Sequence, residues 1–596
     1  MESGATKKEG ARRDGILVRL YGEACFGMQG KGKGMHKGQM RKIVRKAVEN
    51  RFIIILSLLA LGIFYAVNLR PGIIKGSDDS FHLCRLEGLA VDLSYGVFPV
   101  KVHSPLCFGY GYGVGIFYQN HLLYFPALLR VAGVSLELTY KIFSGCIMTA
   151  IYGSAFYAAY RISKDKYAAL VAAVCVLFSW NMVSDFYLDF HMAGSMAMIF
   201  IPLAIAGMLD FLLEDKKPVL LGAGFLGLIC THILSAYLTF FVCAAIALSY
   251  AGRWVNKPKK IGEGILAVGG TLALSISFWL PMLEQFRVQE YKVSRPWTQP
   301  EEHTQLLFSL FGQGGMGWLL FLWILAILLF LTERGKKVKQ RGLLYRLMGI
   351  VFFLFFANAS EAFWRLTKPV TGMVQFPVRL FTVGSVLAAF SVAVTLSEIR
   401  QEKRKKGIAL INFLGAAYFF ISALDGVGIE TLDLGDKAVY EAWAGISAGE
   451  EWLPVETTRE MLTDATLAVA DDGTQARGRK EKGRFHFTMD MEKGYYDIPF
   501  VYYRGYAAQT QEGSRLEVGK NTETSMVRVW IREEDRKGGG SHEVTVWYDG
   551  TKIQRLSYIV NLLALAAMAA VWQYLRRQRS RRNEEEVETG ARGSVR

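Results

Sequence analysis

One short segment of the chain gathers more side chains that could do chemistry than its surroundings do. Residues 76–88 read Gly-Ser-Asp-Asp-Ser-Phe-His-Leu-Cys-Arg-Leu-Glu-Gly. A cap at Ser77 or Asp78 would start a helix here. Asp78, His82 and Arg85 then recur at i, i+4 and i+7 and share one face of that helix, whereas Asp79 points off it. The spacing therefore predicts a carboxylate, an imidazole and a guanidinium on one side of a helix.

These residue types suit the transfer of a group to a hydroxyl or an amine. Asp78 could deprotonate a sugar hydroxyl or an amine as a general base. Together with His82 it could also hold a divalent cation that bridges a phosphate. Arg85 suits a phosphate oxygen through its planar fork of donors. The alternative is a helix cap with local ion pairs and no ligand, and spacing alone leaves both interpretations open.

A Gly- and Tyr-rich stretch follows this segment and could form a substrate loop. Tyr110 and Tyr112 alternate with glycines, and Tyr118 comes shortly afterwards. Glycines let the backbone approach a ligand closely, and tyrosine rings stack on sugars. An irregular loop lying on the bilayer, with its aromatic residues at the interface, would have the same composition. Both interpretations can hold at once.

Stretches that would cross a membrane flank these residues. Hydrophobic residues make up 52% of 596 positions and charged ones only 20%, too few to cover a soluble protein of this length. The apolar blocks run to about 17–25 residues, which crosses a hydrocarbon core of roughly 30 Å. The stretch 118–132 is shorter and contains Pro126, which favours a re-entrant or interfacial helix. We expect an all-α polytopic membrane protein with about 12 transmembrane helices, at residues 52–69, 138–160, 167–184, 195–213, 218–230, 233–250, 263–283, 316–332, 347–364, 380–397, 408–425 and 557–575.

The basic residues predict an orientation for these helices. Lys and Arg cluster in the N-terminal segment, in the C-terminal tail and in five connections, at 161–166, 216–217, 253–260, 334–346 and 400–406. Cytoplasmic loops carry this excess, so both termini are predicted to be cytoplasmic. The net charge of +16 is then assigned to loops that face anionic lipid, and no nucleic-acid partner is expected.

The same parity places loop 70–137 and the long stretch 426–556 outside. Within the latter, residues 484–489, 526–531 and 542–548 alternate apolar and polar side chains between Gly- and charge-rich turns. That pattern predicts a small extracytoplasmic antiparallel β-sandwich. The chain then divides into a basic cytoplasmic segment 1–51, a transmembrane domain 52–425, the β-rich domain 426–556, a final helix 557–575 and a cytoplasmic tail 576–596.

Histidines and cysteines add two smaller points. Histidines gather at outward helix ends or loops, which suggests a polar cavity that opens outward. The six concerned are His82, His103, His121, His191, His232 and His303. Cys84 and Cys107 share the first outer loop and could form a disulfide, although two separate thiols are the favoured interpretation. Met28, Met35 and Met40 are alternative first residues.

Short motifs in family order make the chain resemble bacterial YfhO-type membrane proteins and the related 6-pyruvoyl-tetrahydropterin synthase-related membrane domain. The resemblance is densest over residues 76–142 and extends over most of the chain. Its residues are Asp78, His82, Arg85, Gly96-x-Phe98-Pro99-Val100, Gly109-Tyr110-Gly111, Phe117-Tyr118, His232, Trp279-Leu280-Pro281, Gln375-Phe376-Pro377-Val378-Arg379, Glu451-Trp452-Leu453-Pro454 and Pro499-Phe500-x-Tyr502-Tyr503-x-Gly505-Tyr506. Both families look like members of the GT-C superfamily of polyprenyl-phosphate-sugar-dependent glycosyltransferases.

The resemblance implies a GT-C-like transmembrane fold and a lipid-linked sugar as donor. An acidic residue of the first outer loop would activate the acceptor, and Asp78 matches it best, with Asp79 in reserve. The donor phosphate would be bound by residues that match the family's pattern, namely Arg85, His232, Gln375 and Arg379. Arg379 could equally be an arginine that snorkels to the interface.

Two departures from the family pattern bear on a metal cofactor. Val378 stands where relatives often have Trp, and the second outer loop 187–194 lacks the Arg and the Gly-Glu pair expected there. Transfer of a second-loop acid or metal ligand is therefore weakened. A divalent cation, Mg or Mn, remains a possible cofactor with unknown ligands.

The leading hypothesis is a glycosyltransferase of a bacterial plasma membrane. It would move a sugar from a polyprenyl-phosphate donor to an envelope glycopolymer or glycolipid outside the cell. A lipid-linked-sugar transporter or flippase is an alternative, although the halves carry no obvious inverted repeat. A non-catalytic envelope assembly protein, whose β-rich domain binds a partner, is another.

Overall fold

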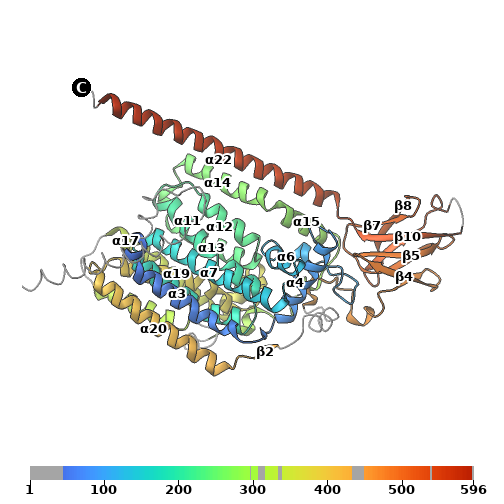
Figure 1. Ribbon diagram of the computed structural model, residues 1–596, viewed down its shortest axis with the longest axis horizontal. Coiled ribbons are helices and arrows are strands. Elements are labelled where there is room, and N and C mark those ends of the chain that lie inside the picture. The colour runs from blue at the N-terminus through green and yellow to red at the C-terminus, as the bar shows by residue number, and fades with distance from the viewer. Residues whose placement is uncertain are drawn as a thin grey trace, which may run out of the picture.

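A helical bundle and a β-barrel make up the structure. The computed structural model describes residues 45–295, 297–305, 316–332, 338–432, 449–536 and 540–593. The basic segment before residue 45, with the alternative first residues, lies outside them. Figure 1 shows the helices running along the long axis with the barrel at one end. The C-terminal helix returns along the bundle, so the C-terminus lies at the end opposite to the barrel.

The helical part has nineteen α-helices in the described residues. In chain order they are α3 (Arg51–Tyr65), α4 (Asp79–Ser94), α5 (Val114–Phe117), α6 (Tyr124–Val131), α7 (Leu136–Ser163), α8 (Lys166–Leu177), α9 (Trp180–Tyr187), α10 (Met192–Ala197), α11 (Ile201–Leu213), α12 (Val219–Ile229), α13 (Ile233–Ser249), α14 (Pro258–Leu274), α15 (Ile276–Phe286), α16 (Trp318–Thr332), α17 (Val338–Ala359), α18 (Glu361–Thr371), α19 (Leu380–Ser397), α20 (Glu402–Val427) and α22 (Lys552–Gly593).

Many of these helices are apolar enough to span a bilayer. Among the described residues, seven are also long enough, at 51–69, 136–163, 192–213, 340–359, 377–397, 402–426 and 552–571. Two bent pairs, α8 with α9 at 45° and α14 with α15 at 70°, raise the number to as many as nine. The apolar helices α12, α13 and α16 are shorter. Each predicted span overlaps one of these elements, and the total of about 12 crossings stays a prediction.

Side-chain caps decide where several helices begin. The Asp165 carboxylate accepts hydrogen bonds from the main-chain N–H groups of Tyr167 and Ala168 at the start of α8. Ser360 caps α18 in the same way, so α17 ends at Ala359. The predicted span 347–364 therefore stops earlier, and α18 exposes Leu366 beside the membrane domain.

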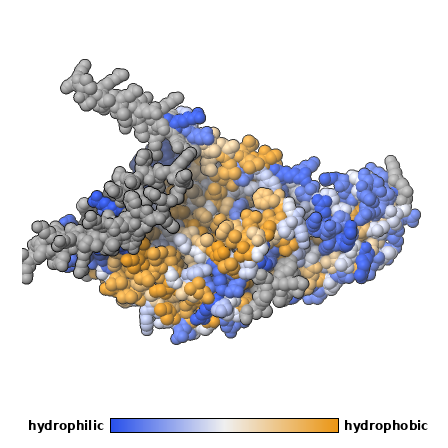
Figure 2. Space-filling model, in the orientation of Figure 1, coloured by the Kyte–Doolittle hydropathy of each residue, from blue (hydrophilic) through white to orange (hydrophobic). Residues whose placement is uncertain are grey.

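Figure 2 shows apolar surface over the helices and hydrophilic surface over the barrel.

The bundle packs closely because small residues line some helix contacts. A Cβ atom at Gly207 of α11 would lie 2.7 Å from the Cα atom of Leu221 in α12. One at Gly224 would lie 2.6 Å from the main-chain nitrogen of Ala204. Without side chains at these positions the two backbones come into contact, as helices in membranes commonly do.

A closed barrel of eight antiparallel strands replaces the predicted sandwich. The strands are β3 (Leu467–Ala470), β4 (Gln475–Glu481), β5 (Arg484–Asp490), β6 (Tyr495–Val501), β7 (Tyr506–Thr510), β8 (Arg515–Lys520), β9 (Met526–Trp530) and β10 (Ser541–Tyr548). Their order is β10-β5-β4-β3-β6-β9-β8-β7, and β10 closes the barrel by pairing with both β5 and β7. The sandwich prediction was wrong because both architectures alternate apolar and polar residues, and only strand pairing separates them.

The barrel is fastened to the first outer loop and to the end of α15. Lys480 of β4 donates to the main-chain oxygens of Gly109 and, at 2.7 Å, Pro499. The Gln285 side chain both donates to and accepts from the main chain of Arg504, at 2.8 and 2.9 Å. A two-stranded ladder, β1 (Ile73–Ile74) with β2 (Thr431–Leu432), joins the segment after α3 to the one after α20. These contacts hold the barrel and the first outer loop at one end of the bundle.

Replacing Gly207 by Leu is expected to destabilise the bundle by about 1–3 kcal/mol, because a side chain there must displace the α12 backbone. Thermal unfolding in detergent, followed by tryptophan fluorescence, should give a lower Tm than for the wild type. Gly269→Leu is the matched control, because a Cβ atom at Gly269 meets nothing within 4 Å. Equal Tm values for the two variants would contradict the close helix contact.

Candidate functional site

Main-chain hydrogen bonds fix the N-terminus of α4 to the loop between α9 and α10. The N–H of Ser77 donates to the Leu188 oxygen at 3.1 Å, and that of Asp78 to the Asp189 oxygen at 2.9 Å. The approach requires glycine at position 76, where a Cβ atom would lie 2.7 Å from that of Phe190. The loop before α4 and the loop between α9 and α10 are thereby joined directly before the predicted Asp78 face begins.

Asp78 lies at the mouth of a cluster of charged side chains. Its surface is open to solvent, yet enough protein surrounds the carboxyl that lost hydration raises its pKa. The nearby positive charges of His191 and Arg379 oppose this rise, while Asp189 adds to it. Asp79 is directed elsewhere, because its carboxylate accepts the N–H of Gly76 at 3.1 Å.

His82 and Arg85 form the buried floor beneath Asp78, and each is 1% exposed. Arg85 donates to the Asn120 side-chain oxygen at 2.9 and 3.1 Å, and its guanidinium lies 4.5 Å from the centre of the Tyr118 ring. Burial, with the charge of Arg85 next, lowers the pKa of His82 well below its ordinary value, so the ring is neutral. Among the described residues, Nη1 of Arg85 and Nδ1 of His82 have no hydrogen-bond partner. Such orphaned atoms are costly unless a ligand or water satisfies them.

A second histidine is held beside Asp78 by a carboxylate. Nδ1 of His191 lies 3.3 Å from Oδ1 of Asp185. Burial alone would lower the pKa of His191, but the hydrogen bond and the negative charge of Asp185, together with the charge of Asp78, raise that pKa overall. A Cβ atom at Gly194 would lie 2.5 Å from Nδ1 of His191, so glycine there makes room for the pair. His232 packs edge-on against His191 with ring centres 5.0 Å apart.

Arg379 reaches the same cluster from the start of α19. Its Nη1 donates to the main-chain oxygen of Val374 and to Oε1 of Gln375, both at 3.0 Å. Its guanidinium also lies 5.0 Å from the centre of the Phe376 ring. Gln375 has a φ of +60°, a conformation that few non-glycine residues adopt. The Gln375–Arg379 segment thus orients one guanidinium toward the carboxyl groups.

The short segment 450–452, which precedes the barrel strands in the sequence, forms the rim of the charged cluster around Asp78. Trp452, in the short helix η9 (Glu450–Trp452), stacks on Phe117 with ring centres 5.1 Å apart and planes 3° from parallel. Tyr118 lies 6.2 Å from Trp452 and 6.2 Å from His232. Burial, with Asp78 as a further cause, raises the pKa of Glu451. Aromatic rings therefore form one wall of the cluster.

The structure gathers Asp78, His82, Arg85, Tyr118, His232, Gln375 and Arg379 around this cluster. The hydroxyl of Tyr110 donates to the main-chain oxygen of Asp464, whereas that of Tyr112 donates to the Gly449 oxygen and accepts the N–H of Trp452 in the rim. Sequence reasoning gave no specific role to Asp185, His191 and Glu451. The histidine clustering at outward helix ends was the one signal that pointed to His191.

The Mg or Mn cofactor considered from the sequence stays a prediction. Within the part of the chain that the structure describes, no three His, Cys, Asp or Glu side chains converge as ligands. No step is therefore assigned to the Mg or Mn ion considered from the sequence. Cys84 and Cys107 are both buried in one apolar cluster of the first outer loop and the barrel side.

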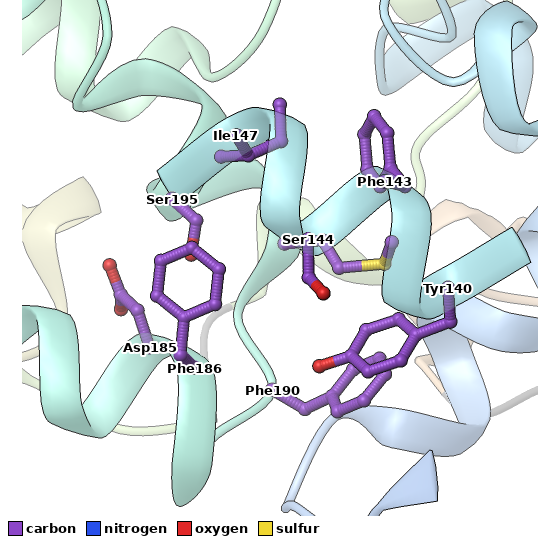
Figure 3. A pocket seen from close by; sticks show the side chains of 9 residues that line it. Tyr140, Phe143, Ser144, Ile147, Asp185, Phe186, Phe190 and Ser195 are labelled. Carbon is purple, nitrogen blue, oxygen red and sulfur yellow. The ribbon is translucent and has the colours of Figure 1, made fainter. Parts of the chain in front are cut away.

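A small cavity of about 20 Å³ lies behind Asp185, between α7, α9 and α10. Figure 3 shows Asp185 and Phe186 on one side of it, and Tyr140 with Phe190 on the other. Those last two rings stack with centres 4.8 Å apart. A cavity of this size has room for about one water molecule beside Asp185.

Comparisons with known proteins give distant structural matches. No family model matches the sequence, and no curated protein matches it. The arabinofuranosyltransferase AftD from Mycobacteria superposes with a TM-score of 0.41 and 13% identity, over 64% of this chain and 28% of that one. The oligosaccharyltransferase of Archaeoglobus fulgidus superposes with a TM-score of 0.34 and 15% identity, over 67% and 56%. At these scores the function must be argued from the side chains of the site.

The Asp185–His191 pair gives a prediction that needs no substrate. Asp185→Asn should lower the pKa of His191, because it removes the carboxylate whose hydrogen bond raises it. NMR titration of histidine-labelled protein in detergent should show one imidazole signal moving to lower pKa. Asp472→Asn, on the barrel surface, should leave all histidine signals unchanged. Unchanged titration in Asp185→Asn would contradict the pairing.

Proposed function

We propose that this protein is a membrane glycosyltransferase that moves a sugar from a polyprenyl-phosphate donor to an acceptor in a bacterial envelope. The observation that carries the proposal is the meeting of Asp78, His191 and Arg379, which come from three separate outer segments. A carboxyl of raised pKa beside two cations suits proton abstraction next to a bound phosphate. The resemblance of the sequence to polyprenyl-phosphate-dependent glycosyltransferases points to the same chemistry.

Asp78 acts as the general base in this proposal. It is the cluster's carboxyl at the solvent-open mouth, where an acceptor hydroxyl can approach. Burial raises the pKa of Asp78 toward neutral pH, and a general base works best when its pKa lies near the pH of the reaction. His191 and Arg379 keep enough positive charge nearby that the carboxylate still forms.

Arg379 and Arg85 receive the donor phosphate. Arg379 is held by Gln375 at 3.0 Å, so its planar fork is oriented before the ligand arrives. Arg85 supplies an Nη1 group that has no hydrogen-bond partner among the described residues. Tyr118 and Trp452 offer ring faces against which a sugar can stack.

The proposed reaction breaks one bond to the sugar and forms another. Asp78 removes the proton of the acceptor hydroxyl, and the acceptor oxygen bonds to C1 of the donor sugar. The bond from C1 to the phosphate oxygen breaks, and its electron pair leaves with the polyprenyl phosphate. Arg379 neutralises the charge that develops on that phosphate, and Asp78 releases its proton to the solvent.

The outward location selects a lipid-linked donor. The cluster lies at the end of the bundle that carries the first outer loop and the barrel. Under the predicted orientation this end is outside the cytoplasm, where nucleotide sugars are not supplied. A sugar carried by a polyprenyl phosphate in the bilayer reaches that side of the membrane, and the acceptor is then an envelope glycopolymer or glycolipid.

Asp78→Asn tests the proposed base. Loss of a general base typically costs about 10²–10⁴-fold in rate, and the amide keeps the shape of the side chain. Glycosylation of envelope polymers should fall by that factor in cells whose only copy is the variant, at equal protein level. Asp79→Asn is the matched control, because its amide oxygen still accepts the Gly76 N–H and most activity should remain. Full activity in both variants would remove the catalytic assignment.

The pH dependence of transfer gives a second test with two opposite signs. Activity should fall as pH drops through the pKa of Asp78, because the base must be ionised. Asp189→Asn removes a negative neighbour, so it lowers the pKa of Asp78 and moves this acid limb to lower pH. Asp185→Asn weakens the positive charge on His191, so the limb moves to higher pH. Rate profiles measured in isolated membranes check both, and shifts in the same direction would contradict the assignment.

A further inference from the structure

Helix α18 begins where a membrane-spanning helix ends. The apolar stretch Gln340–Ala359 of α17 has 20 residues, and at about 1.5 Å per residue it is about 30 Å long, the thickness of a hydrocarbon core. Ser360 then takes an extended backbone and caps the next helix through the N–H of Phe363, so the chain turns at the end of the span. The Gln375–Arg379 segment of the charged cluster follows α18 in the chain. α18 therefore lies at the edge of the bilayer on the side of that cluster.

One face of α18 packs on the bundle. Trp364 is 1% exposed, and its Nε1 donates to the main-chain oxygen of Ala357 in α17 at 2.7 Å. The hydroxyl of Tyr237 in α13 donates to the main-chain oxygen of Val370. These contacts hold both ends of α18 against the bundle, so the directions of its other faces are fixed.

A second face carries charge. Glu361, Arg365 and Lys368 recur at i, i+4 and i+7 and share this face. Arg365 pairs with Glu361, and Lys368 pairs with Glu301 at 3.3 Å. All three α18 side chains are exposed, as expected of a face toward water or lipid headgroups.

The third face is apolar and exposed. Ala362, Leu366 and Val370 recur every four residues and lie on one side of the helix, with Pro369 beside them. Leu366 is 83% exposed and Val370 is 53% exposed. Single apolar side chains are common on protein surfaces, but a row of them along a helix whose next face is charged is typical of an interfacial membrane helix.

The lipid-facing surface of α17 continues onto this apolar face. Phe352, Phe353 and Phe356 lie in the spanning stretch and are 55%, 52% and 60% exposed, so they face acyl chains. The ring of Phe353 contacts that of Phe363 in the first turn of α18, with ring centres 5.7 Å apart. The bilayer that surrounds α17 is therefore next to α18, and it is the occupant that the geometry favours for the apolar face.

An exposed tryptophan lies beside the segment that carries Arg379. Trp297 is 74% exposed, and its ring centre lies 5.8 Å from that of Phe376. The centre of the Phe376 ring in turn lies 5.0 Å from the guanidinium of Arg379. Tryptophan side chains concentrate at membrane–water interfaces, because one end of the indole is apolar and the other can be hydrated. This position agrees with a Gln375–Arg379 segment at the membrane surface.

We infer that α18 is a monotopic helix in the headgroup layer of the leaflet on the side of the charged cluster, with Leu366 and Val370 inserted among the acyl chains. The bilayer is its partner, and α18 thereby holds the Gln375–Arg379 segment at the level where lipid phosphates lie. The location of α18 is independent of the proposed transfer. The use made of it, which is to present Arg379 to a lipid-linked phosphate, rests on the proposed function.

Photocrosslinking of the full-length protein in phospholipid nanodiscs tests the inference. The photoreactive amino acid p-benzoylphenylalanine is placed at position 366 on the apolar face, or at position 361 on the charged face as the matched control. Both positions are exposed, so the bulky residue displaces no packed side chain. Position 356, on the lipid-facing side of α17, is the positive control for lipid contact. Mass spectrometry should find phospholipid adducts at position 366 in a yield close to that at position 356 and about fivefold above that at position 361.

Equal lipid yields at positions 366 and 361 would overturn the inference, because the apolar face would then not be the one that meets the bilayer. A protein–protein adduct at position 366 in place of the lipid adduct would overturn it in favour of a second copy of the chain. The measurement contains no sugar donor. A negative result here therefore leaves the catalytic role of Asp78 standing, and a negative result in the Asp78→Asn assay leaves the location of α18 standing.

Discussion

The site depends on two main-chain hydrogen bonds between outer loops that lie more than a hundred residues apart. The main-chain N–H groups of Ser77 and Asp78 donate to the oxygens of Leu188 and Asp189. Backbone groups at a helix start need partners, and here the second loop provides them. Because Gly76 has no side chain, the loops come close enough for the carboxyl of Asp78 to share a field with His191 and Arg379.

The electrostatics of the cluster are balanced between opposite effects. Lost hydration and neighbouring acids raise the pKa of Asp78, and two cations limit that rise. Asp185 keeps His191 able to carry a proton, whereas burial and the charge of Arg85 keep His82 neutral. Neighbouring histidines therefore differ in charge because their nearest partners differ. Among the described residues, two nitrogen atoms of the buried floor, Nη1 of Arg85 and Nδ1 of His82, have no hydrogen-bond partner, and a polar ligand or water would satisfy them.

The barrel contributes to the site although it lies almost four hundred residues beyond α4. Its strand β4 fastens the first outer loop through Lys480, and the segment before β3 lays Trp452 on Phe117. The ring of Tyr503 packs so closely against Gly113 that a side chain at position 113 would overlap it. The first loop is thus shaped from both sides, by the second loop of the bundle and by the barrel. This arrangement gives the barrel and the charged cluster a common support.

Local pattern was enough to establish several features from the sequence. Apolar blocks of membrane-spanning length, alternating strands near the C-terminus and the Asp78–His82–Arg85 spacing all follow from periodicity. They depend on neighbours a few residues away, which the sequence displays directly. The resemblance to a glycosyltransferase family also singled out Gln375 and Arg379, which the structure places together at 3.0 Å.

Only the tertiary structure showed the features that depend on pairing between distant segments. Alternation along each strand is the same in a sandwich and a barrel, and closure came from β10 pairing on both sides. His191 and Glu451 occur in the histidine clustering and in a family motif, but neither pattern assigns them a role, because their chemistry and that of Asp185 arise from partners on other helices and loops. Tyr110 and Tyr112 read like substrate-loop residues, and that role stays a prediction; the structure adds that their hydroxyls donate to the main-chain oxygens of Asp464 and Gly449. Sequence therefore specified the elements and one catalytic candidate, while contacts between distant segments determined the charge and surroundings of the site.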